Sequence, residues 1–398
     1  MGFRKYPTLI SILLFASLPP LFASDQTIDD LEFRVSLFSL LKPGMIDIQS
    51  PDQGMRFSTR NEERECRRLS VRSTAEGRLA VIFDGIDRRI VETLTLRPET
   101  AGGFIRIQVP SLPERTYSGW LEIAPVSHHL KVIIVLPLRE YLYGVVGSEM
   151  GSETEALKAQ AILSRTFALA NRNRHSGEGF DFCDTTHCQH FTGRARAAGP
   201  IRAAVEATAA QVLSGPDPIC GVFFHSTCGG HTNDAGRGYP CLRGVDDGRN
   251  CSISPHYRWR LKIPEEKWKS LLRAFAPGGS VEPLFLRVDS RSPGGWVRTV
   301  SIVFADGSSV RVTGEAFHLA LGRKLGWNMF KSANFSVKKE GDAWVFFGKG
   351  LGHGIGLCQW GARSLAKNGW SCNRILRHYF PLAQPRSLPI PPADRPTG

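Results

Sequence analysis

Residues 138–150 read LREYLYGVVGSEM, and this stretch marks the change from a β-rich to a helical part of the chain. Its apolar side chains have helical spacing up to Val146, and Pro137 stands directly before it, where proline is compatible with a helix start. Gly147 is the residue type that commonly follows a helix end. The sequence therefore predicts a short helix that begins immediately after a strand.

A second helix is predicted over residues 153–172, because Ser152 and Glu155 have the S-x-x-E spacing of a capping box. One stripe of this helix carries the small and apolar side chains expected to face the core. Lys158 and Arg165 lie two turns apart on a neighbouring stripe. They are candidates for binding a sugar oxygen or a carboxylate, and a solvated helix face is the alternative.

The chain before residue 137 consists of short β-branched and aromatic runs separated by turn residues. Strands return between residues 284 and 312, with Asp306-Gly307 as a hairpin turn. Further helices are predicted at residues 200–211, 315–325, 359–367 and 372–379. The pattern predicts an α+β protein with a β-rich N-terminal part followed by a mixed helical and β domain.

Both ends of the chain differ from its middle. A basic pair and an apolar run, Leu9 to Leu18, have the pattern of an export signal, which we assign to residues 1–24. A β-rich region is expected over 25–129, the main domain over 130–382, and a proline-rich disordered tail over 383–398. No later stretch reaches about 18 uninterrupted apolar residues. The mature chain is therefore expected in the periplasm or cell envelope, without a transmembrane segment.

The composition, 42% hydrophobic and 22% charged residues, is ordinary for a globular protein. A formal net charge of +13 favours an anionic partner. Because an exported protein seldom meets nucleic acid, the expected partners are wall polymers, acidic peptide stems or membrane surfaces. The alternative is that the charge only keeps the protein soluble, since its Lys and Arg residues are scattered.

Glu149 is the first candidate for chemistry. It lies in the joint between the two predicted helices, beside Val145, Val146 and Met150. Apolar neighbours favour the protonated form of a carboxylate, as a general acid requires, whereas the start of the next helix favours the ionised form. A helix-end charge without catalytic role is the alternative interpretation.

Two glycine-containing segments are candidate parts of a ligand cleft. Gly229 and Gly230 permit positive φ angles or close backbone approach, which suits a ligand loop and a tight strand connection equally well. Five glycines in nine residues surround His353 and lead into Gln359 and Trp360. The Trp360 ring is a candidate for stacking on a sugar.

Cysteine and histidine residues gather in one short region. His175, Cys183, His187 and Cys188 have spacing that can supply thiolate and imidazole ligands to a tetrahedral zinc ion. The alternative is a disulfide between Cys183 and Cys188, because cysteines oxidise outside the cytoplasm.

Nine cysteines are an odd number, so at least one is free, metal-bound or paired outside the chain. Cys241 and Cys251 enclose a segment rich in turn residues and are predicted to form a disulfide. His225, Cys228 and His231 form a second, weaker set of metal ligands.

Five motifs in this order resemble the SpoIID/LytB family, named for the stage II sporulation protein D of spore formers and for related amidase enhancers. They are residues 138–150, 155–161 with Arg165-Thr166, Cys188-Gln189, residues 226–232, and residues 352–362. The resemblance covers roughly residues 130–382. Two features depart from the family pattern: the loop after Glu149 is about two residues shorter and lacks a proline, and Cys358 replaces a customary serine.

The resemblance implies a SpoIID-like catalytic domain with lytic transglycosylase activity, which cuts peptidoglycan between N-acetylmuramic acid and N-acetylglucosamine, best on strands that an amidase has stripped of peptides. Sporulation, cell division and wall turnover are the roles such an activity serves. It places the catalytic glutamate on Glu149 and suggests that Lys158, Arg165 and the glycine-rich segment with Gln359 and Trp360 line the cleft. Some members carry zinc near Cys183 to Cys188, so a structural zinc ion is expected, while the chemistry itself requires no cofactor.

A single carboxylate suits this reaction. Ordinary glycosidases need two carboxyl groups that flank the bond, whereas a lytic transglycosylase uses the sugar's own C6 hydroxyl as the attacking group. Two alternatives stay open. One is a non-catalytic peptidoglycan-binding enhancer of an N-acetylmuramoyl-L-alanine amidase, and the other is a zinc hydrolase built on the Cys183 cluster.

Overall fold

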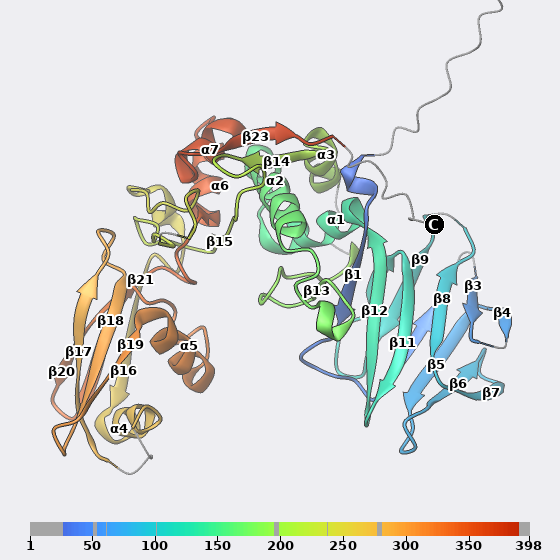
Figure 1. The fold of residues 1–398 in the computed structure, drawn as a ribbon, viewed down its shortest axis with the longest axis horizontal. Coiled ribbons are helices and arrows are strands. Elements are labelled where there is room, and N and C mark those ends of the chain that lie inside the picture. Colours follow the sequence, from blue (N-terminus) through green and yellow to red (C-terminus); the bar gives the residue numbers. More distant parts are fainter. Residues whose placement is uncertain are drawn as a thin grey trace, which may run out of the picture.

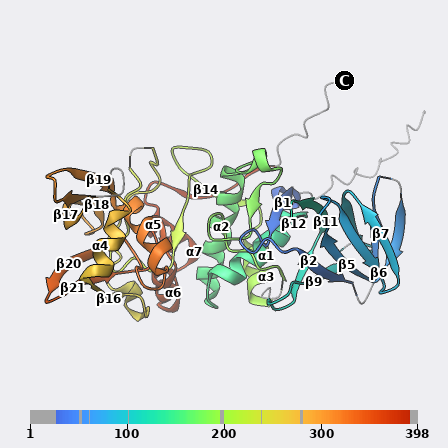
Figure 2. The same ribbon diagram turned by 90° about the horizontal axis from the view of Figure 1, so that it is seen from below.

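The computed structural model describes residues 27–50, 54–60, 62–100, 102–194, 199–236, 238–276 and 281–389. The predicted export signal lies outside these residues. Three parts lie in a row in two perpendicular views: an N-terminal pair of β-sheets, a central group of helices, and a smaller part of helices and sheets (Figures 1 and 2). The predicted α+β class with a β-rich N-terminal part is confirmed.

The N-terminal part contains two sheets whose inward-facing side chains share one hydrophobic core. A short 3-10 helix, η1 (Ile28–Asp30), precedes them. The first sheet has the strand order β13 (Phe182–Cys183), β1 (Glu32–Leu37), β12 (His129–Pro137), β11 (Trp120–Val126), β8 (Leu94–Pro98), β3 (Met55–Ser58) and β4 (Glu63–Cys66). The second has the order β10 (Arg115–Ser118), β9 (Phe104–Gln108), β2 (Met45–Gln49), β5 (Arg68–Ser73), β6 (Leu79–Phe83) and β7 (Asp87–Val91).

The central helices begin where β12 ends. Helix α1 (Leu138–Glu149) follows this strand directly, and α2 (Thr154–Ala170) packs against α1, α3 (Gly199–Ala207), α6 (Gln359–Lys367) and α7 (Cys372–Tyr379). The stripe of α2 predicted to face the core, Leu157, Ala161, Ser164 and Ala168, is buried. The C-terminal helices of the chain thus pack on the same central helix as α1.

Two local predictions for these helices are wrong. Helix α1 continues through Gly147 to Glu149, and the backbone N–H of Met150 still donates to the carbonyl of Val146. The predicted capping box at the start of α2 does not form, because Glu153 is the N-cap residue and its side chain caps nothing.

The third part is an insertion between two strands of two residues each. Strand β15 (Phe224–His225) pairs in parallel with β22 (Leu357–Cys358), and between them the chain forms η4 (Asn250–Ile253) and a unit with its own core. That unit contains the sheet β16 (Arg258–Pro264), β21 (Ala343–Lys349) and β20 (Phe335–Glu340), and the sheet β17 (Pro283–Arg291), β18 (Val297–Phe304) and β19 (Ser309–Thr313). Helices α4 (Glu265–Arg273) and α5 (Gly314–Leu325) pack on these sheets.

The C-terminal segment returns to the central helices. Strand β23 (Gln384–Ser387) pairs antiparallel with β14 (Gln211–Ser214), so the prediction of a disordered tail from residue 383 is wrong for these residues. The reason is that backbone pairing with a neighbouring strand does not require an apolar pattern. Residues 390–398 lie outside the described part. Within the described residues, no helix is both long and apolar enough to cross a bilayer.

Candidate functional site

A cavity of about 360 Å³ lies where the central helices meet β15 and the glycine-rich segment before β22. Elements far apart in the sequence form its wall: the end of α1, the loop between α2 and α3, the 223–226 stretch, and residues 351–359. The lining residues are Glu149, Phe167, Arg174, Thr186, His187, Cys188, Phe223, Phe224, His225, Ser226, Leu351, Gly352, His353 and Gln359. Its volume falls in the range typical of ligand sites.

Glu149 is the last residue of α1, and its half-buried side chain lines this cavity. The backbone N–H of His190 donates to Glu149 Oε1 at 3.0 Å, and Gln359 Nε2 donates to Oε2 at 3.1 Å. Gly151 makes the following turn tight, since a Cβ there would lie 2.4 Å from Arg363 Nε. The carboxyl group is therefore fixed in direction by two partners remote in sequence.

Helix α6 positions Gln359, its first residue. The backbone N–H of Trp360 donates to the carbonyl of Ser226, and Arg363 Nε donates to Glu153 Oε2 at 2.8 Å. Burial alone would raise the pKa of Glu153, but its hydrogen bond with Arg363 leaves this pKa below the ordinary value. The start of α2 and the helix carrying Gln359 are thereby held together.

His225 presents an unpaired nitrogen in the wall of the cavity. Its Nδ1 lies 3.1 Å from the carbonyl of Ile355, which can only accept, so Nδ1 carries the proton. Nε2 is buried and has no hydrogen-bond partner among the residues that the structure describes. Burial, together with the neighbouring His353, lowers the pKa of His225 to about 3. The ring is therefore neutral, with a free lone pair on Nε2.

His353, a predicted cleft residue, also lines the cavity, but both of its ring nitrogens are engaged. Nε2 donates to the carbonyl of Phe224 at 3.0 Å, and Nδ1 accepts from the backbone N–H of Ile355 at 3.0 Å. The ring links the glycine-rich segment to β15. Its visible role is to shape the wall around His225.

The four predicted metal ligands are brought together. The ligand atoms of His175, Cys183, His187 and Cys188 all lie within 4.8 Å of one another. The two sulfur atoms are 3.5 Å apart and unbonded, and Cys188 Sγ is 3.4 Å from His175 Nε2. Glu178 Oε1 lies 2.7 Å from His175 Nδ1, as a carboxylate does behind a metal-bound histidine. This donor set and its spacing fit one tetrahedral zinc ion.

Residues 126–214 match the family model described as "Stage II sporulation protein". The chain carries a SpoIID/LytB-family domain. Residues 241–356 match a second model, described as a domain of unknown function, DUF8618. The SpoIID match contains Glu149 and all four residues of the Cys183 cluster, whereas the second match covers the inserted unit.

Similarity to curated proteins extends over much of the chain. An uncharacterized protein of Brachyspira hyodysenteriae is 26% identical over 355 residues, which is 87% of this chain and 90% of that protein. The stage II sporulation protein D of Bacillus amyloliquefaciens is 29% identical over 62% of this chain and 73% of its own length. The amidase enhancer of Bacillus subtilis is 25% identical over 60% of this chain and 39% of its own length.

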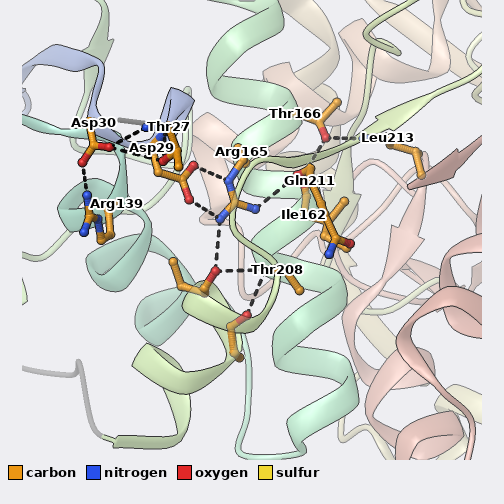
Figure 3. A network of polar contacts seen from close by, with 12 residues as sticks. Thr27, Asp29, Asp30, Arg139, Ile162, Arg165, Thr166, Thr208, Gln211 and Leu213 are labelled. Atoms are coloured by element: carbon orange, nitrogen blue, oxygen red, sulfur yellow. Dashed lines mark hydrogen bonds and ion pairs between the residues drawn. The ribbon is translucent and has the colours of Figure 1, made fainter. Parts of the chain in front are cut away.

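The prediction that Arg165 lines the cleft is wrong. Its side chain is fully buried and forms a two-point ion pair with Asp29, with Nε–Oδ1 2.6 Å and Nη2–Oδ2 2.9 Å. It also donates to the carbonyls of Val205 and Gln211 (Figure 3). The guanidinium binds the N-terminal η1 segment to α2 and α3, with four of its five N–H donors used and no surface exposed to a substrate.

Lys158, the other predicted cleft residue on α2, does not line the cavity either. Its Nζ donates to Glu155 Oε1 at 2.7 Å, while Glu155 Oε2 accepts from the backbone N–H of Cys372 at the start of α7. Helical spacing cannot distinguish a side chain that faces a ligand from one that faces another helix. Arg174, which the sequence did not single out, is the cation that lines the described cavity.

Gly229, Gly230 and Trp360 are not among the cavity-lining residues either. A Cβ on Gly229 would lie 2.5 Å from Lys349 Cβ of β21, and Gly230 has φ 112° and would bring a Cβ 3.1 Å from the carbonyl of Gly248, so both glycines allow a close turn. The Trp360 ring lies under the Arg363 guanidinium, 4.4 Å from its central carbon, which occupies one face of the ring. The sequence left open a ligand loop or a tight strand connection for these two glycines, and the structure shows the tight connection.

The cysteine pairing also corrects a prediction. Cys241 forms a disulfide with Cys220 instead of Cys251. Cys251 instead lies 3.5 Å from Cys228. The weaker metal set predicted from His225, Cys228 and His231 does not form, because Cys228 is grouped with Asp247, Cys251 and Cys358. Spacing along the chain could not reveal this, because the turns between these cysteines fold back on one another.

Proposed function

We propose that this protein is an exported lytic transglycosylase that cuts peptidoglycan glycan strands, with Glu149 as its acid and base. The observation that carries the proposal is that Glu149 supplies the only carboxylate among the residues that line the described cavity. A pair of carboxyl groups is the usual equipment of a glycosidase, whereas intramolecular attack needs one. Similarity to a stage II sporulation protein D supports the assignment.

In the proposed reaction Glu149 donates one proton and accepts another. Protonated Glu149 gives its proton to the oxygen that links N-acetylmuramic acid to the next sugar, and the bond from the anomeric carbon to that oxygen breaks. The C6 hydroxyl oxygen of the same muramic residue bonds to the anomeric carbon, and its proton passes to Glu149. The products are a 1,6-anhydro end and a free hydroxyl, and the acid is regenerated.

The other cavity residues position the strand in this proposal. The free Nε2 lone pair of His225 accepts a hydrogen bond from a sugar hydroxyl, which gives this buried nitrogen a partner. Arg174 pairs with the lactyl carboxylate of N-acetylmuramic acid, which is free only after an amidase has removed the peptide. Gln359 keeps the Glu149 carboxyl directed into the cavity.

A zinc ion held by His175, Cys183, His187 and Cys188 completes the proposed site. Such an ion supplies structural cross-linking. These residues fix the loop whose His187 and Cys188 line the cavity and whose His190 backbone N–H holds Glu149. All four serve as ligands and carry no proton in the reaction.

The decisive test is product analysis on amidase-treated peptidoglycan. Wild-type protein is expected to release 1,6-anhydro-muramic products detectable by mass spectrometry, and Glu149→Gln to lower their rate by about a hundredfold or more. Glu266→Gln, an 85% exposed carboxyl in the inserted unit, is the control and should retain full activity. Full activity in Glu149→Gln removes the proposal.

A second candidate function rests on similarity to a protein named amidase enhancer. In that case the chain binds wall glycan and stimulates an N-acetylmuramoyl-L-alanine amidase without cutting glycan itself. The net charge of +13 suits attachment to an anionic wall under either function. The enhancer alone predicts that Glu149→Gln stimulates purified amidase as well as wild type does while neither protein forms anhydro ends.

A further inference from the structure

A second group of potential metal ligands lies outside the cavity lining, and the proposed reaction uses none of its members. Cys228, Asp247, Cys251 and Cys358 each offer one ligand atom, and these four atoms lie within 4.8 Å of one another. All four residues are buried, with at most 1% of their surface exposed. They come from four places: the turn after β15, the loop before η4, η4 itself and the end of β22.

We propose that these four side chains bind one tetrahedral zinc ion, at a site separate from the Cys183 cluster. Cys228 Sγ lies 3.5 Å from Cys251 Sγ and 3.3 Å from Asp247 Oδ2. A zinc–sulfur bond of about 2.3 Å in tetrahedral geometry separates two sulfur ligands by roughly 3.8 Å. The observed spacing therefore matches ligands of a single ion with only small adjustment.

Backbone donors around the sulfur atoms suit thiolates. The N–H of Cys228 points at Cys358 Sγ at 3.3 Å, that of Gly361 at the same sulfur at 3.4 Å, and that of Gly230 at Cys228 Sγ at 3.4 Å. Each such bond stabilises negative charge on a metal-bound sulfur. Three backbone N–H groups are thus directed at two buried sulfur atoms, and a thiolate accepts such hydrogen bonds more strongly than a neutral thiol does.

The carboxylate is oriented in the same way. The Tyr379 hydroxyl donates to Asp247 Oδ1, and the backbone N–H of Cys251 donates to Oδ2 at 3.2 Å. Among the described residues, the ion-pair partner of Asp247 is the Nε2 atom of His378, 3.9 Å from Oδ1. Burying a carboxylate against three thiols is costly unless a cation compensates the charge. A zinc ion supplies that cation, and the three thiols release their protons on binding.

A disulfide between Cys228 and Cys251 is the competing arrangement. It would use two of the four ligand atoms, leaving the Asp247 carboxylate and the Cys358 thiol buried without a cation. It would also leave the backbone N–H groups of Gly230 and Gly361 directed at neutral sulfur. The metal site accounts for all four side chains.

The zinc ion would fix the start of α6, whose first residue, Gln359, donates to Glu149. Cys358 directly precedes Gln359, and its side chain caps the start of α6 by accepting from Gly361. Cys228 belongs to the turn whose Ser226 carbonyl accepts from Trp360. The ion therefore joins the β15 turn to the first residues of α6, which makes the four ligands positioning residues.

The test is a metal count on the full chain, exported and purified without added metal. In a Cys183→Ser/Cys188→Ser background, which removes the first cluster, we expect one tightly bound zinc ion by native mass spectrometry and elemental analysis. Adding Cys251→Ser should abolish it, and Asp247→Asn should weaken zinc affinity by at least about tenfold. Cys66→Ser, a buried thiol in the N-terminal sheets, is the matched control and should keep the ion.

Two results overturn the proposal: a folded Cys183→Ser/Cys188→Ser protein without zinc, or a Cys228–Cys251 disulfide in peptides mapped after alkylation in denaturant. If Cys251→Ser fails to fold, cobalt added to the Cys183→Ser/Cys188→Ser protein decides the question. Strong thiolate-to-cobalt charge-transfer absorption supports the site, and its absence rejects it. None of these measurements depends on glycan cleavage, so the site and the proposed reaction can fail independently.

Discussion

The candidate site depends on the Glu149 carboxyl group, whose hydrogen-bond partners are too far along the chain to be predicted from the sequence around it. Glu149 was identified because it ends a helix within a recognisable motif. Gln359 was placed in the cleft by the family resemblance, yet its contact with Glu149 spans 210 positions. His225 and Arg174 were missed as cavity residues, because a histidine in a two-residue strand and an arginine after a helix carry no sequence signal for a cavity.

Arg165 shows the opposite error, since a cation on a helix next to the catalytic candidate is in fact a buried structural link. Replacing Asp29 with Asn leaves the guanidinium buried and unpaired, and should reduce the free energy of unfolding by about 3–5 kcal/mol. Urea denaturation followed by circular dichroism measures this loss. Arg139→Gln, which removes an ion pair of a partly exposed residue to Asp30, is the control, with an expected change of at most about 1 kcal/mol.

The same variants test the role of Arg165 in substrate binding. Below its unfolding midpoint, Asp29→Asn should retain the wild-type KM for stripped glycan, because Arg165 does not line the cavity. A raised KM with unchanged stability would show that Arg165 acts on substrate.

At the element scale, helices α6 and α7 were predicted with their observed bounds, because their start and stop signals are local. Ser371 caps α7 by accepting from the backbone N–H of Arg374, as its position at the helix start predicts. The start of α2 was predicted less well, because tertiary partners occupy its acidic side chains. Glu153 pairs with Arg363 of α6, and Glu155 accepts from the first residue of α7.

The link between α2 and α6 predicts a pH-dependent stability. The pKa of Glu153 is lowered by its hydrogen bond with Arg363, against the opposing effect of burial. A carboxyl whose pKa is lower in the folded state stabilises that state above its unfolded pKa, and the contribution disappears as the pH falls through the folded value. Wild type should therefore exceed Arg363→Gln in unfolding free energy at neutral pH, and the difference should shrink below the ordinary value of 4.5.

Urea titrations of both proteins at a series of pH values measure this difference. Lys262→Gln, on the inserted unit, serves as a control for loss of one positive charge and should track wild type at every pH. A difference between wild type and Arg363→Gln that persists unchanged to acidic pH would mean that the helices are held by packing rather than by this ion pair.

At the scale of the whole molecule, the division of the chain was the feature least accessible from sequence. Residues 130–382 were predicted as one domain, yet two hydrophobic cores lie within this range. The inserted unit leaves and rejoins the central part through β15 and β22, each only two residues long. Strands this short have no measurable alternation, so the hydrophobic pattern gives the elements without showing which core they join.

Trp296 of the inserted unit contacts the glycine-rich segment that lines the candidate site. Trp296 is fully buried, its indole N–H donates to the carbonyl of His231 at 2.9 Å, and its ring lies against Gly354 of the glycine-rich segment. A Cβ on Gly354 would lie 2.2 Å from that ring, and Gly354 has φ 79°, a conformation that other residues rarely adopt. The segment that carries His353 and Ile355 thus has its position set by the insertion.

Gly354→Ala is accordingly expected to displace the glycine-rich segment and, with it, the Ile355 carbonyl that orients His225. We expect release of anhydro products to fall by about tenfold or more, since a displacement of about 1 Å at a positioning group costs up to a hundredfold. Gly341→Ala is the matched control: its φ is 61°, yet its Cβ would meet nothing within 4 Å. Both variants carry the unfavourable φ, and only Gly354→Ala adds the contact with the buried Trp296 ring, so activities are compared at a temperature where both proteins are folded. A selective loss of activity in Gly354→Ala then assigns the effect to contact between the inserted unit and the site. Equal activity in the two variants would mean that the insertion does not set the geometry around Glu149.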